Sequence, residues 1–361
     1  MASASLQFCG MGFPARYVQG PGALSDLKNI LQGALHATSP FVIYDAALSR
    51  CLPHFQQVGL TINEVSFPGN CSEVAISALT DTGRELPIDC VIGFGGGKTL
   101  DTAKAVAANL DLPMVIMPSA ASSDAPTSRL VAVYDDHIFK YSRVLERNPD
   151  LVLVDTSIMV EAPKRLLAAG IGDALSKKFE VAHSVSCRVP NTFGMQSLLL
   201  CNTLAQRCYD LIKQHAVNAI RECESKQAGE SFEHIVEACV LYSGLSFEGG
   251  GLSLAHGLLR GLTRIPQTDH FLHGELVAYG TLVQILACPA QRHEFDEVFE
   301  VVKALSLPAS LGAFGVRAPS IDLLESVATQ TLTAPYLVNG AQNIHSDDIV
   351  QAMLELERRA T

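Results

Sequence analysis

A glycine-rich turn between an apolar strand and a helix constrains the fold of this chain more than any other stretch. The strand-like run 89–92 leads into Gly93-Phe-Gly-Gly-Gly-Lys98, and a helical pattern begins at about Thr99. Glycines let the backbone approach a ligand closely, and a helix N-terminus presents free N–H groups and a positive dipole end. The turn is therefore predicted to bind a pyrophosphate through four consecutive residues: Gly95, Gly96, Gly97 and Lys98.

The turn matches neither of the two common nucleotide-binding fingerprints. A P-loop requires a glycine five residues before Gly97, where this chain has Ile92. The pattern G-x-G-x-x-G starts at Gly93 but meets Lys98 in place of its last glycine. A strand-to-helix turn that binds no ligand is the simplest alternative, and the spacing leaves both interpretations open.

Short apolar runs alternate with helical patterns in the first part of the chain. The strand-like runs are 41–44, 64–67, 90–92, 114–117 and 151–154. The intervening helical patterns include 24–32, 71–80 and 99–109. Such alternation predicts a parallel sheet covered on both faces.

After Asp155 the helical patterns follow one another without a strand-like run. We therefore predict two domains with a cleft between them, where small-molecule sites usually lie. Residues 1–161 would form an α/β domain with a parallel, Rossmann-like sheet that binds the cofactor. Residues 162–361 would form an all-α domain that binds metal and substrate.

Composition argues against several classes of partner. The 361 residues carry a net charge of −11 and contain no basic block, so nucleic acid and anionic membranes are poor candidates. No apolar run approaches the roughly 20 residues that cross a bilayer, and the N-terminus lacks the features of a signal peptide. Ten cysteines without a C-x-x-C pair indicate free thiols and a cytoplasmic protein. Cys201 and Cys208, seven apart on a predicted helix, are expected in the core.

Two acidic residues are placed near the ends of predicted strands. Asp45 ends the run 41–45, where an acid can bind an adenosine ribose and repel a 2′-phosphate, although it precedes the glycine turn, the reverse of the Rossmann order. Capping of the next helix is the alternative for Asp45. Asp124 lies in the hydroxyl-rich loop 117–128, beyond another strand, where α/β proteins bind ligands. An ordinary turn is the alternative for this loop.

An acid and two histidines on separate helical segments could bind one cation. Asp173 also suits the N-cap of a helix, and His256 or His273 alone could be a buried imidazole without a ligand. Three protein ligands with an open position are nevertheless the pattern of a catalytic metal site. His270 shares a helical face with His273, so it is a competing ligand or a neighbour of one.

Taken together, these segments resemble the iron-containing (group III) alcohol dehydrogenase superfamily, and most of all its glycerol dehydrogenase branch. The resemblance covers nearly the whole chain. The segments that carry it are 95–104, 123–128, 148–155, 169–176, 247–252 and 273–280. The run Asp124-Ala-Pro-Thr-Ser128 is more typical of the glycerol branch than of the related hydroxy-acid dehydrogenases.

The resemblance implies a role for each candidate residue. Gly97 and Lys98 would bind the NAD pyrophosphate and Asp45 its adenosine end, with Asp101 in the same cofactor site. The nicotinamide side would be lined by Ser119, Ser122, Ser128, Leu130 and Tyr134. Asp124 would contact the polyol. One divalent metal ion, usually zinc in this branch, would be held by Asp173, His256 and His273. The family is usually octameric or otherwise oligomeric.

The implied activity is NAD-linked oxidation of glycerol, or of a similar small vicinal diol, at its secondary hydroxyl, with a metal ion lowering the pKa of the alcohol.

Two departures from the family pattern affect the prediction of the substrate more than the prediction of the reaction. Arg129 replaces a small residue, and the stretch after His256 reads Gly-Leu-Leu-Arg260-Gly261 where family members often have His-Asn-Gly.

Three other functions are compatible with parts of the pattern. A lyase of the same fold, resembling dehydroquinate synthase, would recycle NAD, but its metal set usually begins with glutamate. A P-loop-like NTPase would use residues 95–98 with Asp155 as its second acid, although the glycine loop is one residue short. A non-catalytic binding protein is the third, and the complete trio of metal-binding candidates argues against it.

Overall fold

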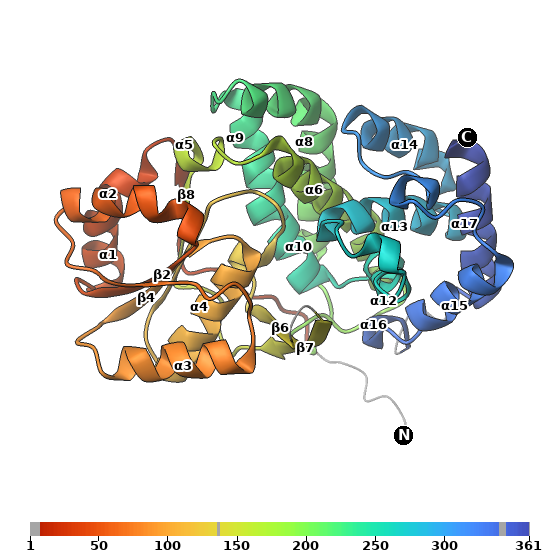
Figure 1. Cartoon of the computed structure of the whole chain (residues 1–361). Helices are drawn as coiled ribbons and strands as arrows, with labels where there is room; N and C mark the ends of the chain where they lie inside the picture. The colour runs from red at the N-terminus through yellow and green to blue at the C-terminus, as the bar shows by residue number, and fades with distance from the viewer. Residues whose placement is uncertain (1–7, 136–137, 339–343, 361) are drawn as a thin grey trace.

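The computed structural model describes residues 8–135, 138–338 and 344–360. Its N-terminal part is built on a sheet of six parallel strands in the order β1-β8-β5-β4-β2-β3. The strands are β1 (Tyr17–Gly20), β2 (Pro40–Tyr44), β3 (Asn63–Ser66), β4 (Cys90–Gly95), β5 (Met114–Pro118) and β8 (Leu151–Asp155). A helical region lies beside this sheet domain (Figure 1). The predicted fold class is therefore confirmed.

Helices cover both faces of the sheet because its strands are apolar on both sides. Val42, Ile92 and Val115 are paired in register and belong to the core beneath α1 (Leu27–Leu35) and α2 (Leu52–Gln57). Phe41, Val91 and the other alternate residues belong to the core that includes α3 (Glu73–Arg84) and α4 (Gly97–Leu110). The second core continues into the helical region, so the two parts share one buried interior. The short helical segments of this part are η1 (Ala23–Asp26), η2 (Ala46–Cys51), η3 (Ala125–Thr127) and α5 (Thr156–Met159).

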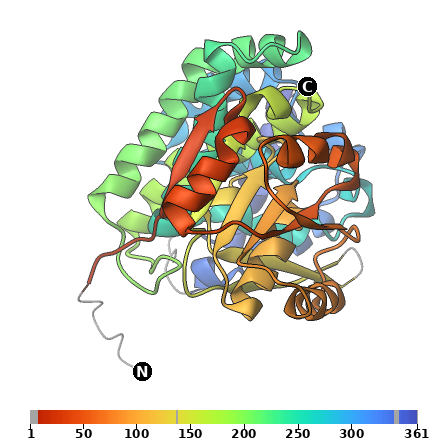
Figure 2. The same ribbon diagram turned by 90° about the vertical axis from the view of Figure 1, so that its left-hand side faces the viewer.

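Two strand features were not predicted. Strand β1 pairs with β8 at the edge of the sheet, and Figure 2 shows this end of the molecule. Its sequence, Tyr-Val-Gln-Gly, is too short and too polar to form a recognisable apolar run. The second feature is an antiparallel hairpin of β6 (Leu130–Asp135) and β7 (Ile138–Val144), in which Val131 and Val133 are buried.

After β8 the described elements are all helical, as predicted. They are α6 (Lys164–Leu175), α7 (Lys177–Ser186), α8 (Leu199–Glu224), α9 (Glu230–Glu237), the π-helical η4 (Ala238–Tyr242), α10 (Ser243–Gly250), α11 (Leu254–Gly257), α12 (Leu259–Leu262), η5 (Pro266–Thr268), α13 (His273–Ala287), η6 (Arg292–Glu294), α14 (Phe295–Ala304), η7 (Gly312–Phe314), α15 (Ile321–Thr331), α16 (Pro335–Val338) and α17 (Ser346–Ala360). In the described part of the chain, no helix has the length and hydropathy needed to cross a membrane.

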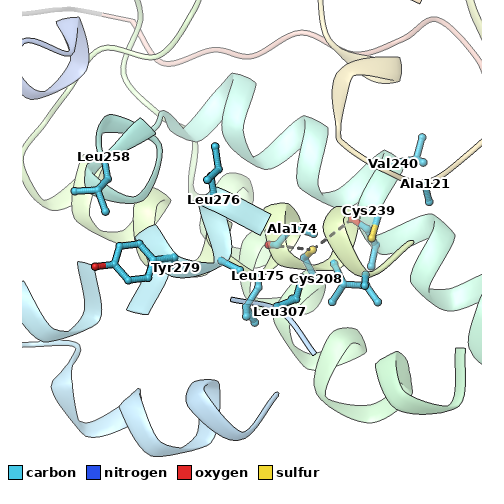
Figure 3. Close-up of a cluster of buried hydrophobic side chains, with 14 of the residues drawn as sticks. Ala121, Ala174, Leu175, Cys208, Cys239, Val240, Leu258, Leu276, Tyr279 and Leu307 are labelled. Carbon is cyan, nitrogen blue, oxygen red and sulfur yellow. Dashed lines mark hydrogen bonds between the residues drawn. The ribbon is translucent and has the colours of Figure 1, made fainter. Parts of the chain in front are cut away.

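The core of the helical region is shown in Figure 3. Leu175 on α6, Cys208 on α8 and Tyr279 on α13 are almost completely buried. The Cys208 thiol lies 3.4 Å from the carbonyl oxygen of Ala238, and burial raises the pKa of this thiol above its usual range. Cys201 is buried on the same helix, so the prediction that both cysteines lie in the core is confirmed.

The N-terminal segment contacts the helical region before the chain enters the sheet. The backbone of Gly10 donates to the carbonyl of Gln196, and the backbone of Gln196 donates to that of Phe8. The Cys201 thiol lies 3.7 Å from the sulfur of Met11. The first described residues therefore pack on the domain that was predicted to begin at residue 162.

Candidate active site

The glycine turn lies at the point where the strand order of the sheet reverses. The chain leaves β2 towards β3 on one side and leaves β4 towards β5 on the other, so β2 and β4 flank a topological switch point. Ligands of open α/β sheets bind at this position, beyond the carboxyl ends of the strands. Asp45 follows β2 and α4 follows β4, which brings the two predicted cofactor elements together.

The glycines of the turn have two different structural tasks. A Cβ at Gly93 would lie 2.6 Å from the Cβ of Ala103, and one at Gly95 would lie 2.9 Å from Thr99, so these two glycines let α4 pack on β4. A Cβ at Gly96 or Gly97 would have no neighbour closer than 3.7 Å. The described residues provide no side-chain cap for α4. Open space in front of an uncapped helix N-terminus fits a pyrophosphate.

The Asp45 carboxylate faces this turn. Its Oδ2 lies 3.4 Å from the backbone nitrogen of Gly96 and 3.4 Å from the Thr99 hydroxyl. Asp45 is also the N-cap residue of η2, but its side chain makes no capping hydrogen bond there. The helix-capping alternative is therefore wrong for this side chain, whereas its contact with adenosine stays a prediction.

Asp101 and Lys104, one turn apart on α4, hold the neighbouring loop and hairpin. The buried Lys104 ammonium contacts Asp101 at 2.8 Å and donates to the carbonyl of Leu130 at 2.6 Å. It also donates to the carbonyls of Ala125 and Ser128. The other Asp101 oxygen accepts from the backbone of Ala132. Asp101 thus supports the cofactor side through the protein backbone, and its direct contact with cofactor stays a prediction.

The residues predicted to line the nicotinamide side lie around the same edge of the sheet. The Lys98 ammonium is 4.5 Å from the ring centre of Tyr134, and the backbone of Ser119 donates to Gly95. The Ser128 hydroxyl is within 3.4 Å of the backbone nitrogen of Leu130. Their contact with nicotinamide stays a prediction, as does that of Ser122.

Close backbone contacts join this loop to the helical region. A Cβ at Gly170 of α6 would lie 1.8 Å from the carbonyl oxygen of Ala121, in the segment that contains Ser122. A Cβ at Gly244 of α10 would lie 1.9 Å from the Thr127 hydroxyl. A Cβ at Gly274, the residue after His273, would lie 1.8 Å from the carbonyl oxygen of Ala169 in α6. Without side chains at these glycines, the loop and three helices can converge on one point.

The three predicted metal ligands lie at that point. Asp173 Oδ1 is 3.3 Å from His256 Nε2 and 3.9 Å from His273 Nε2, and one ligand atom of each residue lies within 4.8 Å of the others. The second carboxylate oxygen of Asp173 is buried without a hydrogen-bond partner among the described residues. An unpartnered buried oxygen beside two imidazoles fits a divalent cation.

Some details of this trio differ from the sequence prediction. Asp173 lies in the last turn of α6 rather than at a helix start, so the N-cap alternative is wrong. His273 begins α13, and its side chain is half exposed, which leaves one side of the trio open to solvent. His270 is exposed against the ring of Phe271 and lies outside this cluster.

Glu180 orients His256 and was missed by the sequence analysis. Its Oε2 lies 2.6 Å from His256 Nδ1, which leaves Nε2 facing Asp173. Burial alone would raise the pKa of Glu180, but the adjacent His256 lowers it to about 2. The same carboxylate outweighs burial and raises the pKa of His256 to about 9. A carboxylate bonded to the far nitrogen of a histidine is typical of metal sites.

Asp124 is linked to the metal trio by the buried Lys177, a second residue that was not predicted. The Lys177 ammonium lies 2.7 Å from Asp173 Oδ1 and 3.1 Å from Asp124 Oδ2. The same Asp124 oxygen accepts from the Ser243 hydroxyl at 2.9 Å. Burial and the neighbouring Asp173 raise the pKa of Asp124, while Lys177 opposes them. The predicted polyol and metal residues thus form one charged cluster.

Arg129 points away from this cluster. Its backbone donates to Glu248 Oε1 at 2.9 Å, and its guanidinium donates to the carbonyls of Leu145 and Thr192 at 3.0 and 2.6 Å. The guanidinium also lies 3.9 Å from the ring centre of Phe193. Arg129 therefore ties the Asp124 loop to the helical region. Arg260, the other departure, lies 3.3 Å from the Thr333 hydroxyl.

Comparisons with known proteins agree with this geometry. The profile of the family described as iron-containing alcohol dehydrogenase matches residues 14–156. The chain is 38% identical to a glycerol dehydrogenase from Thermotoga maritima over 96% of both chains. The crystal structure of a probable glycerol dehydrogenase from Sinorhizobium meliloti superposes with a TM-score of 0.89 at 32% identity, over 98% of this chain and 100% of the other. That of glycerol dehydrogenase from Schizosaccharomyces pombe gives 0.90 at 31%, over 97% and 91%. The chain belongs to the iron-containing alcohol dehydrogenase family.

Proposed function

We propose that this chain is a metal-dependent, NAD-linked oxidoreductase that converts glycerol to dihydroxyacetone, or oxidises a similar small vicinal diol at its secondary hydroxyl. The observation that carries the proposal is the convergence of Asp173, His256 and His273 beside Asp124. The names of the Thermotoga maritima and Schizosaccharomyces pombe relatives support glycerol as the substrate. Zinc is the proposed ion, because a carboxylate and two imidazoles are ligands that suit it.

The residues of this chain divide the work of the reaction. Asp173, His256 and His273 would hold the ion, which when bound supplies a Lewis acid that lowers the pKa of an alcohol. Asp124 would accept a hydrogen bond from a polyol hydroxyl and so orient the substrate. The glycine turn would bind the pyrophosphate and direct the nicotinamide, which accepts the hydride, towards this cluster. The half-exposed side of the cluster at His273 gives the released proton a path to water.

Net formation of NADH from NAD and glycerol tests the proposal. The purified protein is stripped with a strong chelator, reloaded with zinc, and followed by the absorbance of NADH. We expect turnover with zinc and none without it. Absence of NADH formation with glycerol and with other small vicinal diols would contradict the proposed function.

The NADH assay, together with an assay of phosphate release from ATP, separates the proposal from its alternatives. A lyase that recycles NAD would give no net NADH. An NTPase would release phosphate from ATP, but its second acid, Asp155, is already bonded to the backbone of Gly22, Leu24 and Ser157. Those bonds support a structural role for Asp155. A binding protein without catalysis would give neither product.

We expect a preference for NAD over NADP, set by Asp45. A 2′-phosphate beside this carboxylate would meet a negative charge, so Asp45→Ser should narrow the ratio of kcat/KM values for the two cofactors by roughly tenfold. Steady-state kinetics with both cofactors measure the ratio. Asp81→Asn, an exposed site on α3, is the matched control and should leave it unchanged. Equal use of both cofactors by the wild type would contradict the role of Asp45.

Asp124→Asn should lower kcat/KM for glycerol roughly 10- to 150-fold, the effect of losing a charge-assisted hydrogen bond of about 1.5–3 kcal/mol. NAD affinity, measured by NADH fluorescence, should stay near the wild-type value. Asp322→Asn on α15 serves as the control on an exposed site. Loss of NADH binding together with normal glycerol kinetics would move Asp124 to the cofactor site.

We further propose that the protein is a cytoplasmic homo-oligomer that serves glycerol metabolism. All ten cysteines are free thiols, which supports a reducing compartment. Leu199 and Leu200 are exposed at the start of α8, which supports an apolar contact with a second copy. Light scattering of the purified protein gives the oligomeric mass, with an octamer as the family-based expectation. A monomeric mass would contradict this part of the proposal.

A further inference from the structure

Lys177 is a buried cation whose ammonium forms ion pairs with two residues of the candidate site. Its side chain has no exposed surface, and its ammonium contacts Asp173 and Asp124 at 2.7 and 3.1 Å. His256 Nε2 lies 3.4 Å away. Burying an ammonium is costly unless carboxylates compensate it, and this lysine has two. Truncating Lys177 would therefore leave Asp124 without its counter-charge and Asp173 with only the two histidines beside it.

The Lys177 ammonium and a metal ion would share one carboxylate, that of Asp173. Oδ1 accepts from Lys177 and is also the oxygen closest to the two histidines. Asp124, Asp173 and Glu180 bring three negative charges to the cluster, and Lys177 brings one positive charge. Both histidines must be neutral to bind metal, so the cluster then has a net charge of −2, which a divalent ion neutralises.

We propose that Lys177 is a built-in counter-cation that holds Asp124 and Asp173 in place in the metal-free protein and weakens the affinity of the site for its metal. This inference rests on the proposed function, since it concerns the same metal site. Lys177 is a positioning residue, because it acts through the two carboxylates. With Lys177 in place, the site can release and rebind metal while Asp124 and Asp173 keep their positions.

Zinc affinity and metal-free stability of Lys177→Met test the proposal. Methionine preserves most of the side-chain volume and removes the charge. We expect the Kd for zinc, measured by competition with a chromophoric chelator, to tighten by roughly tenfold or more, because the ion no longer meets a nearby positive charge. The metal-free variant should melt at a lower temperature than metal-free wild type, and zinc should remove most of that difference.

Lys178→Met is the matched control. This adjacent lysine pairs with Glu294 and lies 4.0 Å from the Tyr209 ring, outside the metal cluster. The control loses one positive charge from the same helix, and its zinc affinity should equal that of the wild type. If zinc affinity changed equally in Lys177→Met and Lys178→Met, the cause would be the net charge of the protein, and the proposal would be overturned.

A double variant keeps the test decisive if metal-free Lys177→Met does not fold. Lys177→Met/Asp124→Asn removes one charge of each sign, so its zinc affinity and metal-free stability should return towards wild type. A double variant that binds zinc as tightly as the single variant contradicts the proposal. So does a single variant whose zinc affinity is unchanged or weaker. Wild type that binds no zinc would instead contradict the metal site of the proposed function.

Discussion

His256→Ala should lower kcat for glycerol oxidation by roughly a thousandfold or more, because loss of a Lewis acid removes several kcal/mol of charge stabilisation in the transition state. The fold should survive, since the helical region shares an extensive core with the sheet domain, unlike a zinc finger. NADH should still bind, because the glycine turn and Asp45 lie on the sheet domain. The expected variant is therefore a folded protein that binds cofactor and does not turn over.

Circular dichroism, NADH fluorescence and steady-state kinetics measure the three properties separately. Wild type stripped by a chelator should behave like His256→Ala, and added zinc should restore only the wild type. His183→Ala is a suitable control, because this histidine contacts Ser253 and Cys187 and lies outside the metal trio. Normal turnover of His256→Ala, or a fully active metal-free wild type, would contradict a role for metal in the reaction.

Arg129→Leu should reduce the free energy of unfolding by about 3–5 kcal/mol, the usual effect of removing one partner of a buried charge pair. Glu248 is almost completely buried, and its carboxylate depends on Arg129, whose guanidinium lies 3.7 Å away, and on the amide of Asn148. The variant also frees the carbonyls of Leu145 and Thr192. Urea denaturation followed by circular dichroism gives the free-energy difference.

The pH dependence of that difference identifies Glu248 as its source. Burial already raises the pKa of Glu248 in the folded protein, and loss of Arg129 should raise it further. The folded variant would then bind more protons than the unfolded chain, so its stability should fall relative to wild type as the pH rises above the unfolded value of about 4.3. In Arg129→Leu/Glu248→Gln this dependence should disappear. A loss of stability that does not depend on pH would mean that Arg129→Leu acts through packing rather than through Glu248.

The sheet could be predicted because its strands are buried on both faces. The predicted runs 41–44, 90–92 and 114–117 fall within β2, β4 and β5, whose side chains contribute to the cores on both sides. Strand β1 could not be found in this way, because it obtains its stability from pairing with β8 rather than from its own short sequence. Hairpin β6–β7 depends in the same way on a distant partner, because the backbone N–H of Ala132 donates to the side-chain carboxylate of Asp101.

The candidate site was predictable where residue type alone indicates chemistry. Histidine next to glycine and a carboxylate in a glycine-rich segment indicated Asp173, His256 and His273, which lie together in the structure. Glu180 and Lys177 gave no such signal, because charged residues on a helix are normally exposed. Their spacing of seven and four residues from Asp173 places all three on one helical face, and this was the available clue. Burial of that face depends on helices more distant in sequence.

The contact between the N-terminal segment and α8 has a consequence for how the chain is made. Met11 meets a partner, Cys201, that is 190 positions later, and the Asn191 amide donates to the carbonyl of Gly10. During synthesis Gly10 and Met11 therefore stay undocked until the whole sheet domain, Asn191 and the start of α8 have left the ribosome. A fragment cut at residue 161 would keep Met11 without its partner, and one starting at 162 would expose the surface around Cys201. We therefore expect the two halves to fold as one unit, because residues near the start of the described chain pack on the helical region.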